Sequence, residues 1–251
     1  MTDLLKPFKQ PGKAKWIYGP QATEVGRWIR WGDADYLAAR LLFLINLIVQ
    51  ATALSTTAIE KYLKAVCCFY SIKVPKGSKG HDVDYIYSVI KASAKTNTLA
   101  LNEDYLRLLK KAYRVRYPDD LEDGFCIALN QAKMLSQLDR SVLEITRRFH
   151  DVTRDSGFPM ALETAVHKND KRYLDENVAM NPTKSADLFT KPSWCLELRK
   201  YSDDVLESLY RVTHIDDDLV FPEFVITTDK SKETNWEPVF KPLADPPVQK
   251  S

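Results

Sequence analysis

Apolar residues recur at three- and four-residue steps through much of the first 150 positions, and this spacing predicts amphipathic helices. The clearest stripe lies in a helix predicted over about 51–71, at Leu54, Ala58, Ile59, Tyr62, Leu63, Val66 and Tyr70. An earlier helix is predicted over about 33–45. A third begins at His81 or Asp82, after a loop rich in proline, glycine and serine. A fourth begins at Asn102, which is a good N-cap.

A fifth, long helix is predicted from Pro118 to about His150. Proline suits the first helical position, so Tyr117-Pro118 is interpreted as a corner before that helix. Its apolar residues again follow helical steps, at Phe125, Ala128, Ala132, Leu135, Leu138, Val142, Ile145 and Phe149. Helices joined by short connections pack as antiparallel neighbours. The expected fold class is therefore all-α, an antiparallel up-and-down bundle of about five helices, with a partly irregular C-terminal extension.

Changes in composition divide the chain into four predicted segments. Residues 1–23 form a basic, proline-containing tail, and 24–152 form the bundle. Residues 153–241 form a C-terminal extension or small satellite domain, mostly helical with one extended segment. Residues 242–251 are proline-rich and expected to be disordered.

Within the extension, one or two short helices are expected over 160–178 and a longer one over Leu196–Val212. The stretch Leu219–Thr228 is rich in β-forming residues, although Pro222 makes it an edge strand or an extended arm.

One stretch, residues 41–59, carries no charge over a length that would span a bilayer. Asn46, Gln50 and four serine or threonine side chains lower its hydrophobicity. We interpret it as parts of two buried helices joined between Asn46 and Thr52, and we expect no membrane association.

Overall charge gives no reason to expect a particular partner, since 36 basic residues balance 34 acidic ones. The four cysteines lack zinc-ligand spacing, and the N-terminus lacks the pattern of a secretory signal. We therefore expect a reduced cytoplasmic protein with buried thiols, without a metal or a cofactor. Any binding of nucleic acid must come from a local patch.

Three short motifs stand in a fixed order: AIEKYLKA at 58–65, HDV at 81–83 and RYPD at 116–119. Together they resemble the HEPN family, named for its higher-eukaryote and prokaryote nucleotide-binding members. The resemblance covers roughly the first 150 residues. It implies a helical bundle, a homodimer formed through bundle helices, and a nucleotide or RNA as ligand.

Catalytic members of that family carry an arginine followed, after four to six residues, by a histidine. The histidines here are His81, His150, His167 and His214, and no arginine precedes any of them at that spacing. Arg116 is followed by acids, which would repel a phosphodiester. The sequence therefore favours a protein that binds without catalysis.

The positions that match the family motifs suggest a phosphate-binding region containing Lys64, His81 and Arg116. Lys61 and Arg114 would add positive potential, and Tyr117 belongs to the same corner. The alternative is structural: Arg116 caps neighbouring carbonyls or pairs with Glu60, and His81 with Asp82 caps the third helix.

Three hypotheses about function follow. The favoured one is a binding module that recognises a nucleotide or an RNA phosphate. The second is a metal-independent endoribonuclease or toxin-like ribonuclease, which cleavage of labelled RNA would reveal. The third is a purely structural protein whose C-terminal extension docks on a protein partner.

Overall fold

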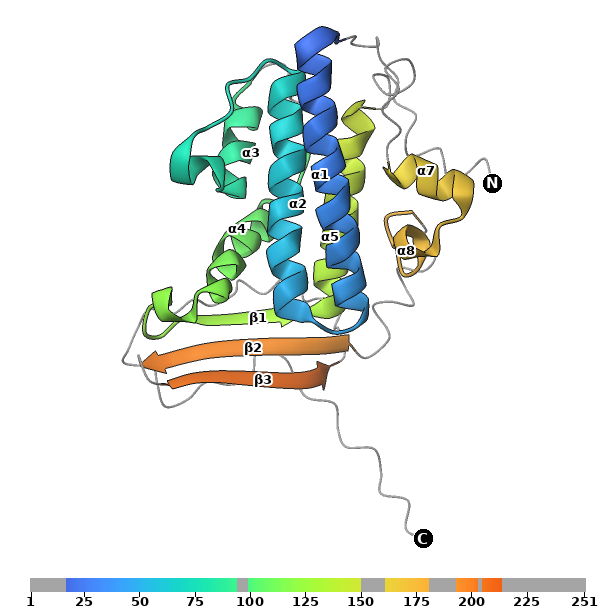
Figure 1. Ribbon diagram of the computed structural model, residues 1–251. Helices are drawn as coiled ribbons and strands as arrows, with labels where there is room; N and C mark the ends of the chain where they lie inside the picture. The colour runs from blue at the N-terminus through green and yellow to red at the C-terminus, as the bar shows by residue number, and fades with distance from the viewer. Residues whose placement is uncertain (1–16, 94–98, 150–160, 181–192, 203–204, 214–251) are drawn as a thin grey trace.

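The computed structural model describes residues 17–93, 99–149, 161–180, 193–202 and 205–213. Three long helices run side by side: α1 (Gly19–Leu44), α2 (Ile48–Phe69) and α5 (Gln131–Thr146) (Figure 1). The shorter α3 (Val83–Lys91) and α4 (Glu103–Ala112) pack against α2 (Figure 1). The predicted helical bundle is confirmed.

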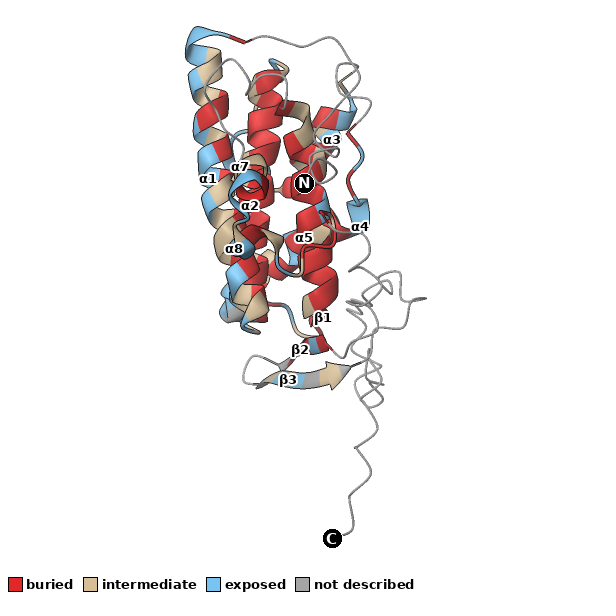
Figure 2. Ribbon diagram, turned by 90° about the vertical axis from the view of Figure 1, so that its right-hand side faces the viewer, coloured by how far each residue is buried: buried red, intermediate tan, exposed pale blue. Residues whose placement is uncertain are grey.

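The core of the bundle centres on α2, which is buried along most of its length, whereas α1 keeps one flank in solvent (Figure 2). Apolar side chains such as Ile59 and Leu63 are fully buried there. Burial of each side chain contributes about 1.5–3 kcal/mol to the free energy of folding, relative to the same side chain in solvent. Gly32 of α1 lies against the ring of Tyr62, and a Cβ at this glycine would come within 3.1 Å of the ring. The two longest helices therefore approach closely at this point.

Local polar groups begin the helices where the sequence predicts them. The Asp82 carboxylate accepts a hydrogen bond from the Tyr85 backbone N–H at 3.1 Å and caps α3. The Asn102 side chain does the same for Tyr105 at the start of α4, also at 3.1 Å. Each cap satisfies a backbone donor that the helix leaves unpaired. Both predicted helix starts are confirmed.

The uncharged stretch 41–59 is divided between α1 and α2, which are separated by a short turn at residues 45–47. Asn46 adopts a left-handed conformation in this turn, with φ of 65°. The prediction of two helices is thus confirmed. Among the described residues, no helix is both long and apolar enough to span a membrane.

The first helix begins earlier than predicted, at Gly19 rather than near residue 33. Pro20 lies in its first turn, where a missing backbone N–H costs nothing. Val25 and Ile29 are buried and continue the apolar stripe towards the N-terminus. Part of the segment predicted as a tail is therefore the start of the longest helix.

The prediction of a helix from Pro118 to His150 is wrong in its first part. Pro118–Asp120 forms only a short 3-10 turn, and Gly124 takes a left-handed conformation that ends any helix. The strand β1 (Cys126–Asn130) follows, buried on both faces. Asn130 then caps α5 by accepting from the Lys133 backbone N–H at 3.0 Å. A short apolar run buried on both faces has no period that separates a strand from a helix.

The helix predicted over Leu196–Val212 is also wrong, because this region forms the strands β2 (Ser193–Ser202) and β3 (Val205–Thr213). The sheet has the order β1-β2-β3, and both pairs are antiparallel. It lies across one end of the bundle (Figure 1). β2 pairs with β1, which lies far away in the sequence, and this pairing favours a strand over a helix. Local propensity alone does not reveal such pairing.

Two short helices, α7 (Ala161–Lys168) and α8 (Lys171–Leu174), confirm the prediction for 160–178. α8 contacts α1. The predicted extended segment Leu219–Thr228, the tail 242–251 and residues 1–16 lie outside the described residues.

Candidate functional site

An open groove lies between α1, the exposed side of α2 and the 3-10 turn η3 (Tyr113–Arg116) that follows α4. Its volume is about 810 Å³. The lining residues come from four separate parts of the chain: Asp35, Val49, Gln50, Ala53, Leu54, Thr57, Glu60, Lys61, His81, Tyr113, Val115 and Arg116. Three of the six residues predicted for the site, Lys61, His81 and Arg116, are thus brought to one groove.

Arg116 presents its charge on the wall of this groove. Its guanidinium lies 4.8 Å from the ring centre of Tyr113 and 5.5 Å from that of Tyr117. The side chain is exposed, and no carboxylate of the described residues pairs with it. Contact with aromatic faces orients a guanidinium while leaving its N–H groups available. Arg116 does not pair with Glu60, as the structural alternative proposed; in the described residues, Glu60 contacts Lys64 and His81 instead.

Glu60 connects the first two sequence motifs. Its carboxylate accepts a hydrogen bond from Lys64 at 2.6 Å and lies 3.2 Å from His81 Nδ1. The Glu60 and Lys64 side chains are only 10% and 9% exposed, whereas that of His81 is 66% exposed. Lys64 is therefore committed to Glu60, and Glu60 fixes one ring nitrogen of an otherwise accessible imidazole.

Lys61 has a carboxylate partner of its own. Its ammonium lies 2.5 Å from Asp35, which also accepts a hydrogen bond from the Thr57 hydroxyl at 2.5 Å. The two charged side chains are about one quarter and one fifth exposed. This pair neutralises the lysine and joins α2 to α1 at the rim of the groove.

Arg114 and Tyr117 hold the corner next to the groove. Arg114 pairs with Glu122 at 3.2 Å and donates to the Asp120 carbonyl at 3.1 Å. Neither Arg114 nor Tyr117 lines the groove, although about half of Tyr117 is exposed. Among the acids after Arg116, the carboxylate of Glu122 thus engages Arg114 rather than Arg116 itself.

Between these charged groups, the groove has an apolar section formed by Val49, Ala53, Leu54 and Val115. An apolar wall beside a cation suits a ligand that carries a flat, weakly polar part and an anionic part. Among the described residues, no group of three or more histidine, cysteine or acidic side chains is placed to hold a metal ion.

Cysteine chemistry does not contribute to the groove. None of the four cysteines forms a disulfide; Cys67, Cys126 and Cys195 are buried and Cys68 is partly buried. Burial raises the pKa of Cys67 to about 12 and that of Cys126 to about 11. Both are therefore protonated near neutral pH and are poor nucleophiles.

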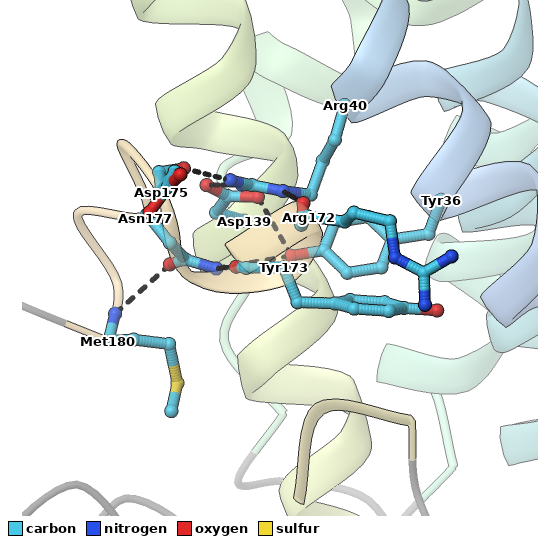
Figure 3. Close-up of polar contacts among 8 residues, drawn as sticks. All are labelled: Tyr36, Arg40, Asp139, Arg172, Tyr173, Asp175, Asn177 and Met180. Carbon is cyan, nitrogen blue, oxygen red and sulfur yellow. Dashed lines mark hydrogen bonds and ion pairs between the residues drawn. The ribbon is translucent and has the colours of Figure 1, made fainter. Parts of the chain in front are cut away.

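A second polar cluster, absent from the sequence prediction, lies inside the bundle (Figure 3). Arg40 of α1 pairs with Asp139 of α5, and both side chains are fully buried. Tyr36 donates a hydrogen bond to the same carboxylate at 2.8 Å. Burial acts to lower the pKa of Arg40, but the Asp139 carboxylate outweighs it, and the net pKa is raised. The guanidinium therefore stays charged in the interior.

This cluster also holds the chain that follows α7. Arg40 donates to the backbone carbonyl of Arg172 at 3.1 Å and to that of Asp175 (Figure 3). Asn177 donates to the Tyr173 carbonyl at 2.8 Å and accepts from the Met180 backbone N–H at 3.1 Å. These hydrogen bonds tie α1 and α5 to the segment that runs from Arg172 to Met180. An arginine inside the apolar stripe of the first helix was the only sequence signal for it.

Comparison with known families agrees with the motifs. A family model described as the HEPN domain matches residues 25–151, just over half of the chain. The chain belongs to the HEPN family. HEPN domains are associated with nucleotides and RNA, and many are ribonucleases or toxins. The match spans all of the groove residues and ends before α7. No curated protein and no solved structure matches the chain.

Proposed function

We propose that this HEPN domain binds the phosphate of a nucleotide or of RNA in the groove between α1, α2 and η3. The observation that carries the proposal is Arg116, an exposed guanidinium on the groove wall without a carboxylate partner among the described residues. Its fork of N–H groups matches phosphate oxygens, and Arg–phosphate hydrogen bonds are among the strongest in proteins.

His81 is the second group assigned to the ligand. It lines the same groove, although 35 positions separate it from Arg116 in the sequence (116 − 81). A proton on Nδ1 satisfies Glu60 and leaves Nε2 to meet the ligand. Lys61 and Lys64 support the site through Asp35 and Glu60, since their charges are already compensated.

Titration of a labelled single-stranded RNA tests the assignment of Arg116. A hydrogen bond to a charged group contributes about 1.5–3 kcal/mol, so Arg116→Ala is expected to weaken binding about ten-fold or more. The slope of log affinity against log salt concentration should also become shallower, by the amount expected for the loss of about one phosphate contact. Arg107→Ala is the matched control, because Arg107 is an exposed arginine of α4 that pairs with Asp104 outside the groove. Wild-type affinity in Arg116→Ala would refute the assignment.

A second candidate function is metal-independent cleavage of RNA. The observation that favours it is the Glu60–His81 contact in the groove that Arg116 also lines, despite the missing Arg–His spacing. His81 would take the proton of a ribose 2′-hydroxyl while that oxygen attacks the adjacent phosphorus. The 5′-oxygen would leave with a proton taken from water, and the proton on His81 would return to solvent, giving a 2′,3′-cyclic phosphate and a 5′-hydroxyl. Arg116 would stabilise the negative charge on the non-bridging phosphate oxygens.

Incubation of labelled RNA with the protein in the presence of EDTA distinguishes the two functions. Cleavage that is lost in both His81→Ala and Arg116→Ala, with cyclic phosphate ends, supports the ribonuclease. RNA that is bound but remains intact supports the binding module alone. Glu60→Gln should slow such cleavage, because it removes the charge that orients His81.

We further propose that the protein forms a homodimer through its bundle helices. The exposed apolar side chains Leu41, Ile45 and Leu47 at the α1–α2 turn support this, since contiguous exposed apolar groups mark interaction surfaces. Sedimentation analysis should find a dimer that Ile45→Asp weakens. A monomeric wild-type protein would contradict this proposal.

A further inference from the structure

Two tryptophans and an arginine gather on α1 close to the groove. The rings of Trp28 and Trp31 meet edge to face, with centres 5.7 Å apart. The guanidinium of Arg27 lies 5.6 Å from the first ring centre and 5.5 Å from the second. Trp28 is partly buried and its indole N–H donates to Glu24 at 2.7 Å. Trp31, in contrast, is 49% exposed.

This aromatic pair is oriented before any ligand arrives. Edge-to-face packing and cation–π contacts each contribute a fraction of a kcal/mol or more, and together they restrict the rotamers of Trp31. An exposed indole that is held in place loses little entropy when a second flat group stacks on it. The cluster thus has the properties of a stacking surface.

The cluster is continuous with the groove. Trp31 precedes the groove residue Asp35 by four positions on α1, so both lie on one face of the helix, one turn apart. On α2, Lys64 links the two regions: its ammonium binds Glu60 of the groove and lies 5.1 Å from the ring centre of Trp28. A ligand that leaves the groove along α1 therefore meets Trp31.

We propose that Trp31 and Arg27 form a second subsite that stacks an unpaired base, so that the ligand is a single-stranded segment of at least two nucleotides. This inference rests on the proposed function of the groove. Stacking on an aromatic side chain is the usual way in which single-stranded nucleic acid is held without regard to sequence. The carboxylate of Glu24 pairs with Arg27 at 2.6 Å and compensates its charge, so the exposed neighbour Arg30 supplies the positive charge for the connecting phosphates.

The test compares a nucleoside 5′-monophosphate with a short adenine tetranucleotide on the full-length protein. Trp31→Ala is expected to weaken the tetranucleotide about five-fold or more and to leave the affinity for the monophosphate unchanged. Trp31→Phe should keep most of the affinity, because a smaller aromatic ring still stacks. Trp194→Ala is the matched control, since Trp194 is 39% exposed but lies on β2 rather than on α1.

Three results would overturn the subsite. One is a tetranucleotide that binds no more tightly than the monophosphate, and another is unchanged tetranucleotide affinity in Trp31→Ala. The third is a Trp31→Ala protein with altered self-association and wild-type RNA affinity, which would make the surface a protein interface. These results differ from those that would refute the phosphate site in the groove. If that site is wrong, Arg116→Ala will bind both ligands as tightly as the wild-type protein, whatever the effect of Trp31→Ala.

Discussion

The buried pair between Arg40 and Asp139 allows a quantitative prediction about how the bundle holds the chain after it. Asp139→Asn preserves the shape of the side chain and an acceptor for Tyr36, but it removes the negative charge. The Arg40 guanidinium is then left uncompensated at a position where both side chains are fully buried. Breaking a buried pair in this way costs about 3–5 kcal/mol. We expect the free energy of unfolding to fall by that amount.

The double variant Arg40→Met/Asp139→Leu separates the cost of a lone charge from the value of the pair. Apolar residues of similar volume often replace a buried pair with little loss. The carbonyls of Arg172 and Asp175 lose their donor in this variant, so some destabilisation should remain. We expect the double variant to be more stable than Asp139→Asn by about 1–3 kcal/mol. Lys171→Ala is the control, because the exposed Lys171–Asp175 pair at 3.9 Å should contribute under about 1 kcal/mol.

Urea unfolding, followed by circular dichroism and by tryptophan fluorescence, measures these differences. A loss below about 1 kcal/mol in Asp139→Asn would refute the reasoning, because it would mean that the interior tolerates a lone guanidinium. A double variant less stable than Asp139→Asn would also refute it.

Two further predictions concern the segments beside the site. Burial raises the pKa of Asp33 from 3.8 to about 6, although the Tyr62 hydroxyl, which donates to it at 2.5 Å, acts to lower it. The folded state therefore binds this proton more tightly than the unfolded state, and stability falls by up to about 3 kcal/mol as pH rises from about 4 to 6. Asp33→Asn should be more stable than wild type at pH 8 and no more stable below pH 4, and equal stability at pH 8 in thermal unfolding would contradict this. A Cβ on Gly80 would lie 2.6 Å from the Pro75 carbonyl oxygen, so Gly80→Ala must displace the turn before His81. It should cost about 1–3 kcal/mol in urea unfolding and also weaken RNA binding, and an unchanged midpoint would argue against the close contact.

Helices that carry both an apolar stripe and a local cap were predictable from sequence. The start of α4 at Asn102 is the clearest example, since the capping residue lies beside the stripe that it caps. The strand β1 was not predictable, because its five residues are buried on both faces and its partner β2 begins at Ser193, more than 60 positions later. Only tertiary pairing decides between a strand and a helix in such a run.

The candidate site was predictable only as far as local motifs identify it. The motifs identified His81 and Arg116, and the fold places both on one groove. Which cations are already compensated depends on partners from other elements: Lys61 meets Asp35 of α1, 26 positions away. The pairing of Arg40 with Asp139 spans 99 positions, and the arginine inside an apolar stripe did not indicate which residue would be its partner. Charge compensation across helices is set by packing, which local sequence does not encode.

Titration of a labelled single-stranded RNA against wild-type protein, Arg116→Ala and Arg107→Ala tests the central claim most directly. We predict saturable binding to the wild-type protein, about ten-fold or weaker binding to Arg116→Ala, and unchanged binding to Arg107→Ala. Equal affinities for all three proteins would contradict the assignment of a phosphate to the groove.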